Sequence, residues 1–494
     1  MNYNTTIIGA NRLNIKEIAK HAILACLAAA SLRQAMAKDL LQVYDDAVLN
    51  DQTLQAADAT RMAAREASPQ ALAALLPQVS GNWAIQRTAS DTGTAEPFPN
   101  PSDPSQVIAI PIGAQSWEDQ RGYNLQLSQT VFSWSQWKSL SRAHKQVAQA
   151  EADYKAAQED LIQRLATAYF NVLSAKDTLD ADQAALDAYT QQLEQANKRY
   201  DVGLIPITDV KEAQAAHDSS AADVITAKRQ LASMEQALRE ITYRDYDALA
   251  APGDSMPLNP PTPADPEQWV QTSMDQNLTL LSRRLAADIA RDAVEVARAG
   301  HYPSISLQAS RAKSTNDTNE DFTFGGPPES ARFPGSQTTN QIELEVTVPI
   351  FSGGATQSQV RQAQYQWIAA KDQMQVTSRQ TEHAARDAYT GVISDIARVA
   401  ALRQGLISAQ VALQATQAGY NVGTRTEVEV LNSRQSLVAA QTTYLQSRYT
   451  YINDYIALKL AAGTLNRATV EEINRWLVTT ESLHGTSPPP ALGQ

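Results

Sequence analysis

The chain has 494 residues, of which 43% are hydrophobic and 19% are charged, so it is too apolar for a disordered protein. Its formal charge is −12, and no Lys/Arg cluster offers a surface for nucleic acid. The single cysteine, Cys26, excludes an intrachain disulfide. Beyond the amino end, no apolar run reaches the roughly 18 residues that a membrane-spanning helix needs. A helical membrane protein is thereby excluded, whereas a β-barrel, whose strands alternate, is not.

The first 37 residues are typical of a secretory signal peptide. A basic stretch precedes the apolar run 22–32, and Ala35-Met36-Ala37 forms an A-x-A cleavage site. Two alternatives are a short buried helix and a lipoprotein signal, in which Cys26 is lipidated. Only four apolar residues, 22–25, precede Cys26 as a core, so we favour cleavage after Ala37. The mature chain then has no cysteine, as suits an exported protein.

The remaining chain repeats itself at a distance of about half its length. Tyr200–Gly203 (YDVG) returns 220 residues later as Tyr420–Gly423 (YNVG). Gln129–Ser133 (QTVFS) is matched 219 residues later by 348–352 (VPIFS). A period this long indicates a duplicated half-protein and not a solenoid repeat.

Both halves carry the same elements in the same order. In the first half we expect a helix within 38–77, a strand pair with an intervening loop at 78–132, and a helical hairpin at 133–245. In the second half, the linker and helix at 246–300 precede a strand pair at 301–351 and a hairpin at 352–462. A segment at 463–494 ends the chain, and Pro488–Pro490 suggests a mobile tail. The inserts 91–119 and 315–338 are rich in Pro, Gly, Ser and Asn, which predicts loops.

The four strands alternate with a period of two. Val79, Trp83 and Ile85 alternate with polar residues, and Ile342, Leu344 and Val346 alternate with Glu343 and Glu345. A half-solvated soluble sheet is one interpretation. We favour a barrel, because nothing else in the sequence packs on the apolar face and the opposite face is uniformly polar. Four strands cannot close a barrel alone, so further copies must complete it.

Very long helices follow each strand pair. Ser135–Tyr200 contains neither Pro nor Gly and carries a heptad seam in which only Asp182 is polar. A second seam runs through 428–456. Between paired helices, Gly203 and Gly423 are expected to take the left-handed cap conformation, and Thr208 and Thr426 to cap the returning helices.

This ordered set of features resembles the TolC family of outer-membrane efflux and secretion channels. The matching pieces cover essentially all of 38–470 in order: Leu40–Tyr44 (LLQVY), Leu75–Val79 (LLPQV), Tyr200–Asp209 (YDVGLIPITD), Tyr420–Thr426 (YNVGTRT) and 462–466 (AGTLN). The implied fold is an α+β membrane protein, internally duplicated. Three copies of four strands make a 12-stranded outer-membrane barrel, continued by a long α-helical coiled-coil barrel in the periplasm.

The resemblance also implies a function and partners. The chain is expected to be the passive exit duct of a tripartite efflux pump or a type I secretion system. The expected partners are a periplasmic adaptor, an inner-membrane transporter and outer-membrane lipid. In this family 38–77 and 463–494 belong to the equatorial region around the coils, and the inserts between strands are extracellular.

The resemblance places site residues near the hairpin turns. The gate is expected to use Thr208 and Asp209 on one hairpin with Tyr420 and Arg425 on the other, held by charge-assisted hydrogen bonds. The family's constriction falls at Glu429 and Asn432, so one of its two acids is lost here. Glu429 has a competing interpretation as the N3 residue of a capping box started by Thr426. The hairpin tips that contact the adaptor are expected at Val202, Gly203, Leu204, Val422, Gly423 and Thr424, and the barrel lumen at Glu343 and Glu345.

The sequence does not indicate catalysis, metal binding or a cofactor. Nucleotide-binding, hydrolase and zinc-protease motifs are missing from the sequence, and its six histidines are scattered. Tyr420 and Arg425 could equally be a seam residue and a solvated tip charge. The rival hypothesis is a soluble periplasmic or surface coiled-coil scaffold or adaptor, which would have the signal and the heptads but no use for four amphipathic strands.

Overall fold

The computed structural model describes residues 37–253 and 256–478. The chain divides into two compact units, each formed by segments from both halves of the sequence. One contains 59–153 and 279–377, and the other contains the described parts of 1–58, 154–278 and 378–494. The predicted signal peptide falls almost entirely outside the described residues.

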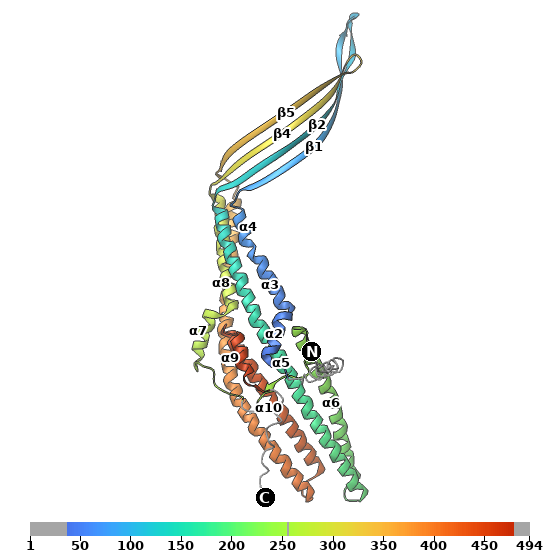
Figure 1. Ribbon diagram of the computed structural model, residues 1–494, viewed down its shortest axis with the longest axis vertical. Coiled ribbons are helices and arrows are strands. Elements are labelled where there is room, and N and C mark those ends of the chain that lie inside the picture. Colours follow the sequence, from blue (N-terminus) through green and yellow to red (C-terminus); the bar gives the residue numbers. More distant parts are fainter. Residues whose placement is uncertain (1–36, 254–255, 479–494) are drawn as a thin grey trace, which may run out of the picture. The chain divides into compact units, whose positions relative to one another are not determined.

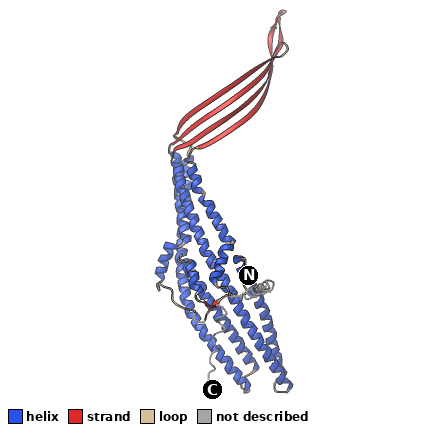
Figure 2. Cartoon of the chain, in the orientation of Figure 1, coloured by secondary structure: helices blue, strands red, loops and turns tan. Residues whose placement is uncertain are grey.

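The first unit, which we call the sheet unit, contains four long antiparallel strands in the order β1-β2-β4-β5 (Figures 1 and 2). Their bounds are β1 Gln78–Asn100, β2 Asp103–Ser133, β4 Ser304–Phe324 and β5 Glu329–Thr347. The two halves meet through the pairing of β2 with β4, whereas β1 and β5 do not pair with each other, so both are edges of the sheet. The predicted α+β architecture with four strands per chain is confirmed.

The expectation of loops at 91–119 and 315–338 is wrong. Residues 91–100 and 103–119 continue the β1–β2 ladder without a register shift as far as Pro99↔Val107. The second insert likewise extends β4 and β5, leaving a turn only at 325–328. Pro97, Pro99 and Pro334 lie on edge strands, where a missing N–H leaves the ladder intact. The composition of the inserts predicted loops, but their residues pair as strands.

The second unit, which we call the helical unit, contains the parts of two helical hairpins that include their turns. They are α5 Trp134–Asp201 with α6 Ile207–Thr242, and α9 Ala355–Asn421 with α10 Glu427–Ala461. Both hairpins agree with the predicted long helices and turns. None of the helices in 37–253 and 256–478 is both long and apolar enough to cross a bilayer.

Each half's shorter helical segment is broken, where the sequence predicted a continuous helix. In the first half the segment forms α2 Leu40–Asn50, α3 Gln52–Arg65 and α4 Ala67–Ala73. In the second half it forms α7 Pro266–Gln276, α8 Leu278–Arg298 and the 3₁₀ turn η1 Ala299–His301.

A polar side chain lies at the break between α2 and α3 and another at the break between α7 and α8. Asp51 has extended backbone angles and accepts a hydrogen bond from the Leu54 N–H at 2.8 Å, so it caps α3. It is buried and pairs with Arg164 of α5 at 3.0 Å. Asn277, which is also extended, donates from Nδ2 to the carbonyl of Ala461 at 3.1 Å. Tertiary contacts therefore terminate helices that local propensity would continue.

Aromatic residues of both hairpins form the core of the helical unit. Tyr169, Phe170 and Tyr451 are almost fully buried, and the Phe170 and Tyr449 rings stack at 5.9 Å between centroids. The Tyr169 hydroxyl donates to the Ala250 carbonyl at 2.7 Å and so ties the linker to α5. The linker strand β3 Ala251–Pro252 pairs with β6 Leu477–Val478, close to the end of the described chain.

The carboxyl-terminal segment is ordered further than the sequence predicted. α11 Arg467–Asn474 buries Val470 and Ile473 in the core of the helical unit. Asn466 caps it by accepting from the Thr469 N–H at 3.2 Å. A mobile tail therefore cannot include residues 467–474. The Pro488–Pro490 stretch, which suggested the tail, lies outside the described residues.

A buried carboxyl pair between α9 and α10 predicts a pH-dependent stability. Burial, with the neighbouring Asp454 carboxyl adding to it, raises the pKa of Asp395 to about 6. The raised pKa means that the folded state binds the proton more tightly, so stability is greatest below about pH 4 and falls as the pH rises through 6. We expect Asp395→Asn to remove this loss and to stabilise the protein at pH 8 by about 2 kcal/mol.

Thermal unfolding between pH 4 and 8 tests this prediction. Between pH 5 and 8 the melting temperature of Asp395→Asn should decline less than that of the wild type; a decline from Glu159, whose pKa burial raises to about 7, remains in both. Asp387→Asn, an exposed position on the same helix, is the matched control. Parallel pH profiles for Asp395→Asn and wild type would contradict a shared proton at this pair.

Candidate functional site

The sheet presents one apolar and one polar face, and both are exposed in a single chain. Trp83 is 69% exposed, Leu344 63% and Ile342 81%. Paired strands place Val79 opposite Leu127 and Ala309 opposite Ile342, so the apolar side chains share one face. Such an exposed apolar face marks an interaction with lipid or with another protein.

The polar face carries the predicted lumen residues. Glu343 and Glu345 lie on β5 with their strand partners Gln308 and Ser306 on β4. Glu345 accepts weak hydrogen bonds from Gln308 Nε2 at 3.4 Å and Ser306 Oγ at 3.5 Å. The structure therefore places both acids on the same polar face, as the alternation predicted. Their role in a lumen stays a prediction.

The two predicted heptad seams differ in how they are buried. Along α5 the seam is buried at Leu161, Leu165, Val172 and Ala196. Along α10 it is buried only from Tyr449 onward, whereas Val428 is 41% exposed. The seam residues of α10 near the turn therefore stay at least partly exposed, whereas Glu427 and Val430 beside them are buried.

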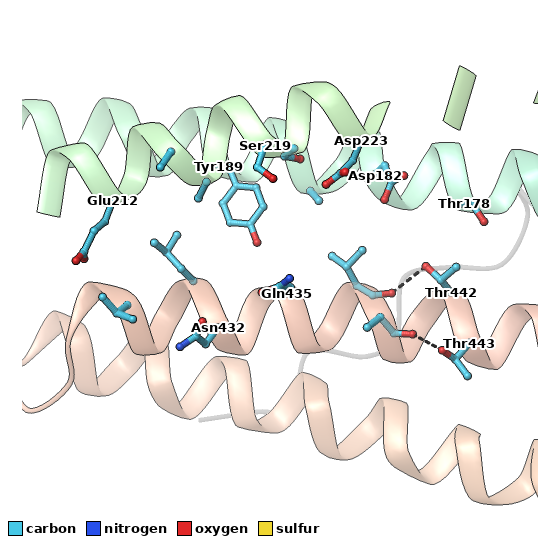
Figure 3. A pocket seen from close by; sticks show the side chains of 18 residues that line it. Thr178, Asp182, Tyr189, Glu212, Ser219, Asp223, Asn432, Gln435, Thr442 and Thr443 are labelled. Atoms are coloured by element: carbon cyan, nitrogen blue, oxygen red, sulfur yellow. Dashed lines mark hydrogen bonds between the residues drawn. The ribbon is translucent and has the colours of Figure 1, made fainter. Parts of the chain in front are cut away.

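A cavity of about 660 Å³ separates the two seams at this point (Figure 3). Asp182, Glu212 and Asp223 line it from α5 and α6, and Asn432 and Gln435 line it from α10. The charges are one-sided, because the side chains that α10 contributes are all uncharged. Asn432, one of the two predicted constriction residues, thus faces the groove between the hairpins of one chain.

The two hairpin turns have the same geometry. Gly203 and Gly423 have φ of +75° and +81°, as predicted. In each turn the N–H of the glycine and the N–H of the next residue donate to carbonyls in the last turn of the preceding helix, as in a Schellman motif. In the first turn Gly203 donates to Tyr200 and Leu204 to Arg199. In the second, Gly423 donates to Tyr420 and Thr424 to Gly419. Val202, Leu204 and Val422 are each about 70% exposed or more (69%, 73% and 76%).

The returning helices begin differently. Thr426 caps α10 in a complete capping box, accepting from the Glu429 N–H while Glu429 Oε2 accepts from the Thr426 N–H at 2.7 Å. Pro206 takes the cap position of α6 and makes no side-chain cap bond, so the expectation that Thr208 caps α6 is wrong. Thr208 instead donates from Oγ1 to Asp209 at 3.3 Å.

The predicted gate residues are only partly brought together within one chain. Arg425 Nη1 donates to Glu429 Oε1 at 2.7 Å, within its own hairpin. The Thr426 N–H and the Arg425 guanidinium lower the pKa of Glu429, in that order of importance. The capping-box interpretation of Glu429 is therefore present in the structure. No contact of Arg425 with Asp209 is found among the described residues of the single chain.

Tyr420 contacts the other hairpin through residues that the sequence did not single out. The Arg199 guanidinium carbon lies 4.9 Å from the Tyr420 ring centroid, a cation–π contact from α5 to α9. Burial, assisted by the Glu427 carboxylate and opposed by Arg199, raises the pKa of Tyr420 to about 12. Glu427, in the first turn of α10, is 2% exposed and accepts a short hydrogen bond from Gln192 Nε2 of α5.

The Glu427–Gln192 contact was missed because neither residue lies on a predicted seam. The seams run through 189, 193 and 196 on α5 and through 428 and 431 on α10, so 192 and 427 are their immediate neighbours. A glutamate in a helix's first turn is also expected for the helix dipole alone. Only the packing of the hairpins shows that this carboxylate is buried, and its Oε2 has no hydrogen-bond partner in the described part of the chain.

A sheet with one exposed apolar face, two long helical hairpins and contacts between the hairpins near their turns together define a membrane channel protein with a helical extension. The family model described as outer membrane efflux protein matches residues 43–242 and 269–464. The chain belongs to this family of outer-membrane efflux and secretion channels, and the two matched stretches agree with the predicted duplication. It is an outer-membrane protein with a periplasmic extension, so the scaffold hypothesis is wrong.

The relatives support this assignment over nearly the whole chain. Outer membrane protein TolC of Escherichia coli is 33% identical over 445 residues, which cover 90% of this chain and 86% of that protein. Alkaline protease secretion protein AprF of Pseudomonas aeruginosa is 27% identical, covering 91% and 89%. The Campylobacter jejuni CmeC outer membrane channel has the same fold, with a TM-score of 0.66, 19% identity and 89% coverage of each chain.

Proposed function

We propose that three copies of this chain form one passive exit duct for an efflux pump or a type I secretion system. The observation that carries the proposal is the four-stranded sheet with two unpaired edges and an exposed apolar face. Joining β5 of one copy to β1 of the next removes every edge and turns the apolar face to lipid. The polar face with Glu343 and Glu345 then lines the water-filled lumen, where the two acids favour cations.

The partners follow from the chemistry of the helical unit. The exposed apolar residues at both tips and the acid-lined groove offer a docking surface for a periplasmic adaptor that presents apolar and basic side chains. Energy is supplied by an inner-membrane transporter, because the duct itself only opens and closes.

We further propose that the gate consists of contacts between the two hairpins near their turns. Tyr420 with Arg199 and Glu427 with Gln192 hold the hairpins together within one copy. Arg425 and Asp209 in turn pair between neighbouring copies of the trimer. Glu429 completes the capping box and lies with Asn432 near the narrowest ring, which carries one carboxylate per copy at these two positions.

Single-channel conductance in a planar bilayer tests both the duct and the gate. We expect Tyr420→Phe combined with Arg425→Ser to raise conductance severalfold above that of the wild type, because the first change removes the hydroxyl that interacts with Glu427 and the second removes the Arg425 guanidinium. Tyr365→Phe with Arg361→Ser makes the same chemical changes at exposed positions of α9 and should leave conductance unchanged. Unchanged conductance in the Tyr420/Arg425 variant would refute this gate, and a wild type that never conducts would refute the duct.

A further inference from the structure

The basic residues of the sheet all lie on one of its two faces. All Lys and Arg residues of the four strands lie on the apolar face: Arg87, Arg121, Arg311, Lys313 and Arg332. Every one of them is exposed. The opposite face carries only acids, among them Glu343 and Glu345. Beyond the apolar band the same face also carries Asp91, Asp119, Asp317 and Asp321, so a cation needs an outside partner only where none of these acids pairs with it.

On β1, β2 and β4 these cations mark the end of the apolar band. On β1, Arg87 is the first outward residue after Ile85. On β2, which runs the other way, Arg121 is the first after Tyr123. On β4, Arg311 and Lys313 are the first after Ala309.

The strand pairing shows that this boundary runs obliquely across the sheet. Ile85 lies opposite Arg121, and Tyr123 lies opposite Lys313. Leu125 lies opposite Arg311. Each step from β1 toward β4 therefore moves the boundary closer to the helical end of the strands. Barrel strands are tilted by roughly 45° to the membrane normal, so a plane parallel to the membrane crosses them obliquely in this way.

Two of the five basic residues already form ion pairs with aspartates on the same face. Arg87 pairs with Asp119 through two hydrogen bonds of 2.7 Å, and Arg332 pairs with Asp317, with Nε at 2.7 Å from Oδ1. For Arg121, Arg311 and Lys313 no ion pair is found within the described ranges of the chain, although Arg121 is near enough to Asp119 and Asp317 to attract both carboxylates. Three cations therefore remain available at the edge of the apolar band.

The three available cations are neighbours. Lys313 and Arg311 are two residues apart on β4, which puts their Cβ atoms at about 7 Å. Arg121 is diagonal to Lys313 across the strand pair, and this spacing is about 7–8 Å. Three long cationic side chains at this spacing can converge on one or two phosphate groups, and guanidinium groups bind phosphate with paired hydrogen bonds.

We propose that Arg121, Arg311 and Lys313 bind phosphate groups of anionic lipid in the outer leaflet of the outer membrane. The helices extend into the periplasm, so the boundary that lies farther from the helices faces the outer leaflet. The apolar residues below it meet the acyl chains, and the cations meet the phosphates of a lipid such as lipid A. The proposal rests on the proposed barrel, in which this face is turned to lipid.

The experiment measures binding of bisphosphorylated lipid A to the full-length protein in nanodiscs of neutral lipid. Each cation near a charged membrane surface contributes about a fivefold change in affinity, so we expect Arg121→Gln/Arg311→Gln/Lys313→Gln to bind roughly 100-fold more weakly. The control Lys211→Gln/Lys228→Gln/Arg229→Gln removes three exposed cations from α6 and should bind like the wild type. Lipid A without phosphate should bind equally weakly to all three proteins.

Two outcomes would overturn the proposal. One is equal affinity of the sheet variant and the wild type for phosphorylated lipid A. The other is displacement of the lipid by millimolar inorganic phosphate, which would assign the site to free phosphate. Conductance and a heat-modifiable oligomer are measured on every variant. A wild type that lacks both would refute the duct, whereas failure of lipid binding with both intact refutes only this site.

Discussion

Replacement of Gln192 by glutamate is expected to keep the channel open. Gln192 is 5% exposed and donates to Glu427, which is 2% exposed. Gln192→Glu puts a second carboxylate against the first in a buried site, and removes the only hydrogen-bond donor that the described residues provide to Glu427 Oε1. Leaving a buried carboxylate without its donor and beside a like charge costs about 3 kcal/mol, enough to shift a closed population by more than a hundredfold. Bilayer conductance should therefore rise to that of the open channel.

A reversed pair separates gating from a general loss of structure. Gln192→Glu combined with Glu427→Gln restores one amide donor and one carboxylate with their positions exchanged, so we expect it to return conductance toward the wild-type value. Gln195→Glu makes the same substitution at an exposed position one turn along α5 and should have no effect. If the single variant conducts like the wild type, or the reversed pair stays open, Gln192 and Glu427 do not hold the closed state.

Elements with strong local patterns could be predicted from the sequence. The continuous helix over Ser135–Tyr200 follows from an unbroken heptad pattern without Pro or Gly, and the structure extends it by only one residue at each end. The turns at Gly203 and Gly423 follow from glycine's access to positive φ. The capping box of Thr426 and Glu429 is a pattern of two residues three apart. In each case the deciding interaction lies within a few residues along the chain.

Features decided by distant residues could not be predicted. The break at Asp51 depends on Arg164, which is 113 residues away, and the burial of Glu427 depends on Gln192, 235 residues away. The long strands at 91–119 depend on ladder partners that override a composition typical of loops. The family resemblance predicts a gate near the two turns, but the residues that meet there in one chain, Tyr420 with Arg199, could be identified only from the packed hairpins.

Gly463→Ala is expected to cause the largest loss of stability of any change at the turns. Gly463 has φ of +68° and ends α10 in the same Schellman geometry as the hairpin turns, with Gly463 N–H bonded to Leu460 and Thr464 N–H to Lys459. A Cβ at this position would lie 2.6 Å from the carbonyl carbon of Gln276 and 2.8 Å from the Cα of Asn277. These are backbone atoms of the α7–α8 junction, so they cannot move aside as a side chain could.

Gly423→Ala is the matched control, because Gly423 has φ of +81° and its Cβ would meet no atom within 4 Å. It should lose only the cost of a left-handed alanine, about 1 kcal/mol. Gly463→Ala adds the overlap with Gln276 and Asn277, which we expect to raise the loss to about 4 kcal/mol or more and to abolish the heat-modifiable oligomer. Melting temperature and oligomer yield in detergent measure both effects. Equal losses in the two variants would mean that the close approach of Gly463 to the α7–α8 junction does not contribute to folding.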